Sequence, residues 1–242
     1  MAKAPLKILV VDCVEKDTLP LGGVDGWFRA ALKKCDPRVE VKTVRASALD
    51  WENEVGWADA VMISGSPRDA FADDEWTHAL MAKVARLLEN KKPVLGVCYG
   101  HQILGRVKGG KVERCKEGWE LGETKVKVTP EGVNSPLLQG LSEQMNVMQS
   151  HQDCVLTVPG QGVLLASSPH TRVQAARWAE QAYGVQFHPE FTGEVLRGVW
   201  KERRDKWRGQ VKFDLDQTLD QAKECPDGLA IFRNFLKMIG ST

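Results

Sequence analysis

The chain has 242 residues, of which 43% are hydrophobic and 27% charged, and its formal net charge is +1 at pH 7. These values are typical of an ordinary globular protein and give no electrostatic reason to expect nucleic acid or a membrane as a partner. No apolar stretch is long enough to span a bilayer, and residues 1–5 lead into a strand-like run without the apolar segment of a secretion signal.

The cysteines are scattered along the chain and form no C-x-x-C pair. The six positions are Cys13, Cys35, Cys98, Cys115, Cys154 and Cys225. This spacing argues against a zinc site and against a disulfide scaffold, and it is typical of proteins in a reducing compartment. We therefore expect a cytoplasmic protein that holds no metal.

Strand-like and helical patterns alternate through the first hundred residues. Strands are predicted at 7–12, 38–44, 60–64 and 94–97, and amphipathic helices at 24–35 and 73–90. Strands and helices that alternate with short connections predict an α/β fold with an open, mostly parallel sheet and helices on both faces.

The pattern changes after residue 105 to short strand-like pieces separated by Gly, Pro and Asn. These pieces lie at 111–114, 123–129, 144–150, 154–158, 163–167, 173–178 and 182–187. They predict a partly antiparallel extension of the same sheet. Helices are predicted at 134–138, 193–208 and 227–239, and the mixed charges at 201–206 indicate an exposed helix face. Without a linker or repeat, we expect a single domain over residues 1–242.

A candidate nucleophile lies where the strand at 94–97 ends. Cys98 stands between Gly96 and Gly100, and a helical pattern follows at once. This is the layout of a nucleophile elbow, in which glycines two residues before and after permit a tight strand-to-helix turn. The N–H groups and dipole of the following helix favour a thiolate. The alternative is an inert cysteine in a core strand, a common environment for this residue.

A thiolate needs a base, and His188 is the best placed of the five histidines. It follows a strand-like run, and Glu190 lies two residues further on. In extended backbone, residues i and i+2 point to the same side, so the carboxylate can orient the imidazole and support its charged form. The alternative for His188 is a surface histidine in a turn.

An oxyanion hole requires two backbone N–H donors. The N–H of Tyr99, directly after the nucleophile, is one candidate, and Gly65 at the end of the strand 60–64 is the other. Gly65, Ser66 and Pro67 can also be read as a simple turn. The outer walls of the pocket are expected from the loops 12–26 and 118–122.

Four segments, taken together and in this order, resemble the class I glutamine amidotransferases. They are Ser64-Gly65-Ser66-Pro67, Gly96-Val97-Cys98-Tyr99-Gly100-His101-Gln102, Gln149-Ser150-His151-Gln152-Asp153 and Gln186-Phe187-His188-Pro189-Glu190. The resemblance implies the family's flavodoxin-like fold and a triad of Cys98, His188 and Glu190 that attacks the γ-carbonyl of a glutamyl group. It also implies oxyanion donors at Gly65 and Tyr99, and glutamyl-binding positions at Gln102, Ser150 and His151. Without the resemblance, Ser150 and His151 are only the end of a strand.

The stretch from Gly65 to Phe71 is more similar to stand-alone family members than to biosynthetic subunits, and this subset is similar to plant γ-glutamyl peptidases. The resemblance implies hydrolysis of glutamine, glutathione or glutathione conjugates through a γ-glutamyl thioester. Residues 105–112 nearly match a phosphate-binding loop but lack its final hydroxyl and follow a helix, so no nucleotide or other cofactor is expected.

Three functions therefore compete. The first is a stand-alone hydrolase of small-molecule γ-glutamyl substrates, which needs no partner. The second is a glutaminase subunit that delivers ammonia to a separate synthetase. The third is a non-catalytic regulatory module of the same fold.

Overall fold

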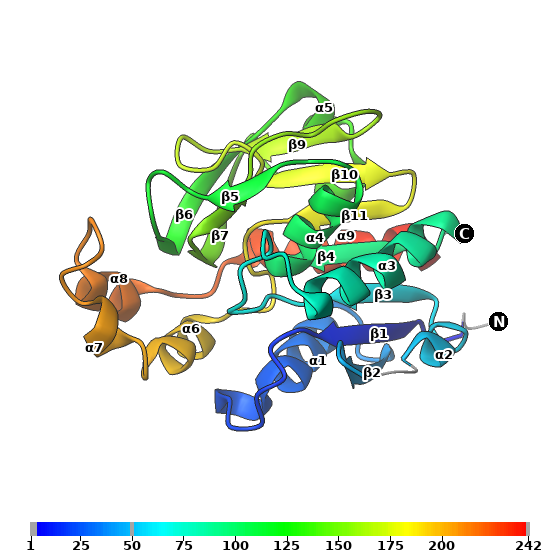
Figure 1. Cartoon of the computed structure of the whole chain (residues 1–242), viewed down its shortest axis with the longest axis horizontal. Coiled ribbons are helices and arrows are strands. Elements are labelled where there is room, and N and C mark those ends of the chain that lie inside the picture. Colours follow the sequence, from blue (N-terminus) through cyan, green and yellow to red (C-terminus); the bar gives the residue numbers. More distant parts are fainter. Residues whose placement is uncertain (1–3, 49–50, 241–242) are drawn as a thin grey trace.

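The computed structural model describes residues 4–48 and 51–240. Residues 1–3, part of the stretch in which no secretion signal is expected, lie outside the described residues. Within the described residues, nine strands form one sheet in the order β2-β1-β3-β4-β11-β10-β9-β6-β7 (Figure 1). The expected α/β fold, a mostly parallel sheet with an antiparallel extension, is confirmed.

The N-terminal half of the sheet is parallel. Its strands are β1 (Lys7–Asp12), β2 (Glu40–Arg45), β3 (Ala60–Ile63), β4 (Val94–Val97) and β11 (Ala182–Val185). The four central strands are short runs of buried apolar residues, as expected for strands covered on both faces. Because β3, β4 and β11 run in the same direction, the residues that follow them meet at one edge of the sheet.

Helices cover both faces of this half. On one face lie α1 (Gly23–Cys35) and α9 (Pro226–Gly240), and on the other lie α3 (Glu75–Glu89) and α4 (Tyr99–Val107). The alternation of β1 separates the two cores, since Ile8 and Val10 pack with α1 and α9 while Leu9 and Val11 pack with α3 and α4.

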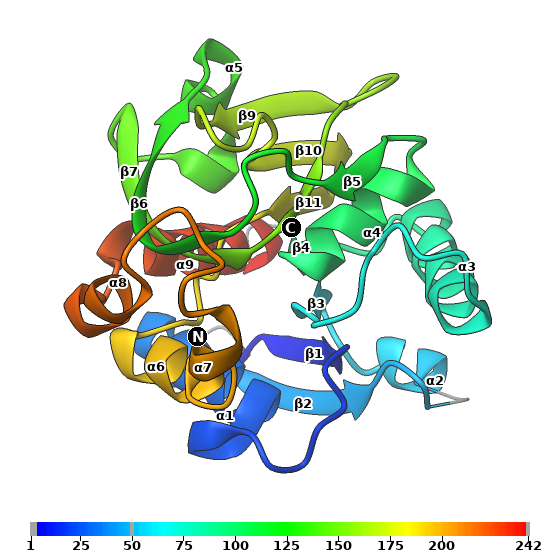
Figure 2. The same cartoon turned by 60° about the vertical axis from the view of Figure 1, so that its left-hand side comes forward.

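The antiparallel half extends the sheet beyond β11. It consists of β10 (Ala175–Ala179), β9 (Val163–Ser167), β6 (Glu120–Val128) and β7 (Gln144–His151). A separate pair, β5 (Val112–Arg114) and β8 (Asp153–Val155), lies beside α4. The remaining helices are short: α2 (Glu52–Val55), α5 (Pro130–Val133), α6 (Gly193–Trp200), α7 (Arg204–Trp207), α8 (Leu215–Gln221) and the 3-10 turns Pro20–Gly22 and Pro136–Leu138. Figure 2 shows α6, α7 and α8 gathered at one side of the sheet.

Two expectations need correction. The helix predicted at 193–208 is interrupted after Trp200, and a turn separates α6 from α7. The cysteine spacing argued against a disulfide scaffold, whereas one disulfide is present: it joins Cys115, directly after β5, to Cys154 in β8, with Cα atoms 5.6 Å apart. Among the described residues, the other four cysteines are unpaired.

In the part of the chain that the structure describes, no helix combines the length and the apolar character that crossing a membrane requires. The cytoplasmic location and the single domain over residues 1–242 stay predictions.

Candidate active site

Cys98 occupies a strained turn between β4 and α4. Its backbone has φ of 51° and ψ of −101°, values that L-residues with side chains rarely adopt. The flanking glycines are sterically required, since a Cβ on Gly96 would lie 2.5 Å from the carbonyl carbon of Gly100, and one on Gly100 would lie 2.4 Å from the oxygen of Ile63. The turn is held by a hydrogen bond from the N–H of Cys98 to the oxygen of Val185 (2.8 Å).

His188 and Glu190 meet as the i, i+2 spacing predicted. Nδ1 of His188 lies 2.8 Å from Oε1 of Glu190, and both side chains are buried. The ring of Phe191 stacks on the imidazole with 4.1 Å between centroids. Among the described residues Nε2 of His188 has no hydrogen-bond partner. The ring is therefore held on one side and available to a reacting group on the other.

The charge state of His188 suits a partner of a thiolate. Burial alone would lower its pKa, but the charges of Glu190 and Cys98, with the hydrogen bond to Glu190, outweigh burial and raise the pKa to about 10. At neutral pH the imidazole is therefore protonated, and an adjacent imidazolium stabilises a thiolate.

Gly65 lies directly against this pair. A Cβ at this position would come within 2.9 Å of Cε1 of His188 and 3.6 Å of Cβ of Cys98. The backbone before it is fixed, because the oxygen of Ser64 accepts a hydrogen bond from the N–H of Gly100 (3.1 Å). The N–H of Tyr99 lies in the first turn of α4, where helices leave N–H groups without an intrahelical acceptor.

A cavity opens over Cys98. Its polar lining includes Ser64, Gly65, Ser66, Cys98, Ser150, His188, Glu190 and Arg203, and its apolar wall is formed by Val14, Leu19, Val24, Trp27, Phe28, Pro67, Phe191 and Val199. The loop 12–26 thus contributes to the wall as expected, whereas no residue of 118–122 reaches this lining.

Arg203 is the one lysine or arginine on this lining, and the sequence interpretation missed it. Its position in the mixed-charge run 201–206 indicated an exposed helix face, which holds for its neighbours Lys201 and Glu202 but not for Arg203, which is half-buried. A signal was present: Arg203 lies three residues after Trp200 and four before Trp207, the spacing of one helix face.

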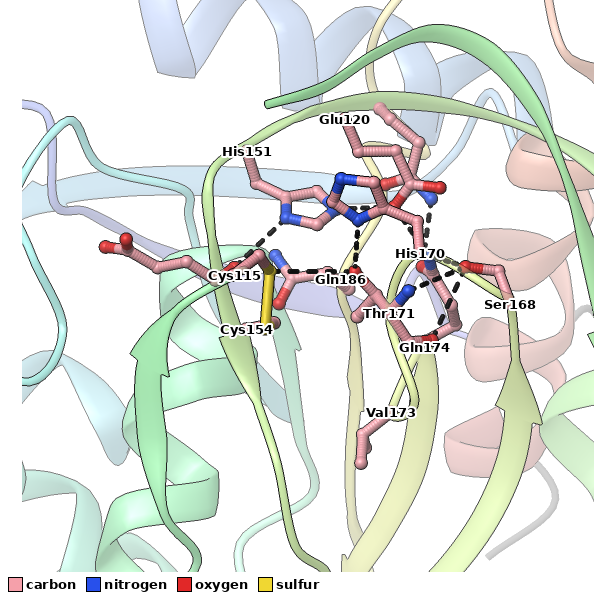
Figure 3. Close-up of polar contacts among 12 residues, drawn as sticks. Cys115, Glu120, His151, Cys154, Ser168, His170, Thr171, Val173, Gln174 and Gln186 are labelled. Atoms are coloured by element: carbon pink, nitrogen blue, oxygen red, sulfur yellow. Dashed lines mark hydrogen bonds and ion pairs between the residues drawn. A yellow bond between two sulfur atoms is a disulfide. The ribbon is translucent and has the colours of Figure 1, made fainter. Parts of the chain in front are cut away.

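Three residues were predicted to bind the glutamyl group, and the structure places them differently. Ser150 lines the cavity, and its Oγ accepts a hydrogen bond from Nε1 of the buried Trp200 (2.9 Å). Gln102 and His151 are buried beneath the lining. Nε2 of Gln102 donates to the oxygen of Asp153 (2.9 Å) and to Oε1 of Gln186 (3.1 Å). The contacts of His151 are described below (Figure 3).

Among the described residues, no group of three His, Cys, Asp or Glu side chains is placed to hold a metal ion.

Comparisons with known proteins extend the picture beyond the site. Residues 23–200 match the family model described as glutamine amidotransferase class-I. The chain is 38% identical over 140 residues to gamma-glutamyl peptidase 5 of Arabidopsis thaliana, a match that covers 57% of this chain and 56% of that protein. It is 39% identical over 197 residues to a glutamine-hydrolyzing GMP synthase of Aeropyrum pernix, which covers 78% of this chain and 36% of the synthase.

Solved structures share the fold. A glutamine amidotransferase from Thermotoga maritima superposes with a TM-score of 0.79 at 20% identity, covering 98% of this chain and 99% of the other. The matched region spans only a little over half of the Arabidopsis peptidase and about a third of the synthase. The family model nevertheless covers most of the present chain, which therefore belongs to the class I glutamine amidotransferase family.

Proposed function

We propose that the protein is a cysteine-dependent hydrolase that cleaves γ-glutamyl amide or peptide bonds through a γ-glutamyl thioester. The observation that carries this proposal is the geometry around His188. One ring nitrogen is fixed by Glu190 at 2.8 Å, and the other is free beside a cysteine on a strained strand-to-helix turn. Nucleophile, base and orienting acid in this arrangement are the parts of an acyl-transfer triad.

The reaction would proceed in two stages. The Cys98 thiolate attacks the γ-carbonyl carbon, and the N–H groups of Gly65 and Tyr99 receive the developing oxyanion. The His188 imidazolium gives its proton to the leaving nitrogen, the C–N bond breaks, and the amine or ammonia departs. The neutral His188 then takes a proton from water, whose oxygen attacks the thioester carbon. The C–S bond breaks, glutamate is released, and the thiolate and imidazolium are restored.

The lining supports a substrate that carries a carboxylate. Within the described part of the chain the Arg203 guanidinium has no hydrogen bond or ion pair; burial lowers its pKa, and the charges of Glu202 and Cys98 oppose that effect. A half-buried cation on this lining is suited to bind an anionic group of the substrate. Ser150 would contact the glutamyl group from the opposite side of the lining, and Gln102 and His151 would support it from beneath.

The leaving group is proposed from the relatives. The protein of Arabidopsis is named a gamma-glutamyl peptidase, which favours peptides such as glutathione or its S-conjugates beside glutamine. The apolar wall formed from the loop 12–26 and α1 is the part of the lining that would contact an apolar substituent of such a conjugate.

A glutaminase subunit is the second candidate. The similarity to a glutamine-hydrolyzing GMP synthase, which covers 78% of this chain, supports this candidate. Such a subunit would release ammonia for a separate synthetase and would be strongly activated by that partner. The third function, a non-catalytic module, does not require the ordered contacts around His188.

The deciding experiment measures glutamate released from glutamine, glutathione and a glutathione S-conjugate by the wild type and by Cys98→Ala. We expect turnover of a peptide substrate by the wild type and none by the variant. Cys35→Ala serves as the control because Cys35 is half-buried and lies outside the cavity lining. Turnover of glutamine alone, rising when a synthetase is added, would favour the subunit instead. Equal activity of Cys98→Ala and wild type would overturn the proposal.

A further inference from the structure

A buried polar cluster lies directly behind Ser150, outside the triad. Glu120, at the start of β6, is its centre (Figure 3). Its Oε2 lies 3.0 Å from Nε2 of His151, 2.9 Å from Nε2 of Gln174 and 3.4 Å from Nδ1 of His170. Glu120 is 7% exposed, His151 3% and Gln174 0%. A carboxylate this buried is stabilised only by such partners.

The ring of His151 faces an acceptor on each side. Nε2 faces the Glu120 carboxylate, and Nδ1 lies 3.0 Å from the backbone oxygen of Asp153. Neither acceptor can donate, so both hydrogen bonds form only when the imidazole carries two protons. The carboxylate is suited to this state: burial would raise the pKa of Glu120, but the hydrogen bond and charge of His151, together with His170, hold it below its usual range.

From His151 the cluster continues toward the catalytic residues. The oxygen of Asp153 that accepts from His151 also accepts from Nε2 of Gln102, and Gln102 donates in turn to Gln186. Gln186 lies two residues before His188, and Ser150 directly precedes His151. The cluster thus joins the end of β7, the helix α4 of the elbow and the segment that carries the base.

We propose that Glu120 is a positioning residue that acts through His151. By holding the His151 ring between two acceptors, it fixes Ser150 and Gln102 beneath the non-reacting end of the substrate. The inference rests on the proposed function, in which those residues serve the α-amino and α-carboxyl groups of a γ-glutamyl substrate. Contacts to this end are made equally in the ground state and the transition state, so their loss raises KM more than it lowers kcat.

Glu120→Gln is the central test, because it keeps the size of the side chain and removes its charge. We expect KM for the best γ-glutamyl substrate to rise about tenfold, the effect of replacing a charge-assisted hydrogen bond by a neutral one. The kcat should change by less than about threefold. Glu123→Gln, an exposed carboxylate on the same strand, is the matched control and should leave both constants unchanged.

A second readout is independent of activity. The ring nitrogens of His151 are followed by NMR at one fixed pH in the wild type and in Glu120→Gln. Other titratable groups face this pair: His170, whose ring centroid is 5.9 Å from that of His151, His101 of α4, and Glu117, which faces His170. The fixed pH holds this background constant, and we expect the Nε2 resonance of His151 to move in the variant because a neutral amide replaces the carboxylate that it contacts.

The outcomes separate the two claims. An unchanged KM together with an unchanged Nε2 resonance of His151 would overturn the positioning role, whatever the activity. A wild type that hydrolyses no γ-glutamyl substrate would overturn the proposed function, while the NMR shift still decides whether Glu120 controls the ring. Should Glu120→Gln not fold, His151→Gln tests the same pair, because both N–H donors of an amide lie on one nitrogen, whereas the ring presents one nitrogen to each acceptor.

Discussion

Cys98 holds a backbone conformation that costs about 1–3 kcal/mol for a residue with a side chain. Two contacts maintain this conformation. The N–H of Cys98 donates a hydrogen bond to the oxygen of Val185, and Gly100 lies so close to Ile63 that no side chain would fit between them. Each proposed role of a single residue can be tested by a substitution that adds or removes one atom or one charge.

Glu190→Gln removes the charge that contributes most to raising the pKa of His188. We expect kcat to fall by roughly 10²–10⁴-fold, the range of a general acid–base contribution. Because less negative charge then supports the imidazolium, the alkaline limb of the kcat/KM profile should move to lower pH. Glu194→Gln, an exposed neighbour on α6, should leave the profile unchanged. A wild-type profile in Glu190→Gln would exclude Glu190 as the orienting acid.

Gly65→Ala should abolish activity without unfolding the protein. The added Cβ would lie 2.9 Å from Cε1 of His188, closer than real contacts allow, so the ring or the loop must shift. Gly56→Ala is the control, since its Cβ would meet nothing nearer than 3.8 Å. Turnover is measured beside thermal unfolding; full activity in Gly65→Ala would contradict the close packing of this donor against the base.

At the scale of elements, the β5–β8 pair fastens the loop that contains Gly65. Arg114 on β5 contacts Asp69 of that loop and Asp153 of β8, at 2.7 Å each. Cys115 directly follows Arg114, and Cys154 directly follows Asp153. A disulfide joins these two cysteines. The β5–β8 pair therefore contacts the loop that contains Gly65 and the helix α4, and its strand β8 directly follows the end of β7.

Asp153 should make stability depend on pH in an unusual direction. Burial raises its pKa to about 7; Arg114 opposes this, and Asp69 adds to it. Between the pKa of the unfolded chain and that of the folded one, only the unfolded chain loses the proton, so rising pH destabilises the fold. Urea unfolding at pH 5 and pH 8 should show wild type losing stability relative to Asp153→Asn as the pH rises. The opposite trend would contradict the raised pKa.

The parallel half could be predicted from the sequence because its information is local. Continuous apolar runs mark buried strands, and the helix predicted at 73–90 begins after Asp74, which accepts a hydrogen bond from the N–H of Thr77 (2.8 Å). The candidate roles of Cys98 and of the His188–Glu190 pair also came from local patterns. Glycines lie two residues before and after Cys98, and Glu190 lies two residues after His188. Whether these residues carry out catalysis stays a prediction.

The parts that were missed depend on distant contacts. Cys115 and Cys154 are 39 residues apart in sequence and meet only because β5 pairs with β8. The start of β6 was placed three residues late, since Gly122, with φ of 83°, looks like a turn although it lies within the strand. Glu120 was consequently left outside the predicted strand, and nothing local revealed its partner His151.

At the scale of the whole molecule, α9 joins the two halves of the sheet. It packs against α1 on the parallel side and against β7 and the turn Pro136–Leu138 on the antiparallel side. Nδ2 of Asn234 donates to the oxygens of Leu137 (3.0 Å) and Gln139 (2.9 Å). The last helix thus completes a core that residues from both ends of the chain share.

Phe232→Ala should reduce global stability without altering the site. Phe232 is fully buried, and its ring lies 5.6 Å from that of Phe28 on α1. Truncation of such a side chain costs about 3–5 kcal/mol in free energy of unfolding. Denaturant unfolding measures the loss, and KM of the remaining folded protein should equal that of the wild type. A loss below about 1 kcal/mol would contradict the role of α9 in closing the core.

The pairing of β11 with β4 has an evolutionary consequence. Val97 and Val185 are partners in the parallel ladder, and Cys98 and His188 follow them by one and three residues. The spacing of Cys98 and His188 is therefore set by main-chain hydrogen bonds at the centre of the sheet, independently of the identity of the surface loops. Insertions or exchanges in the loop 12–26 or around Arg203 would alter the wall of the cavity while this spacing is inherited unchanged.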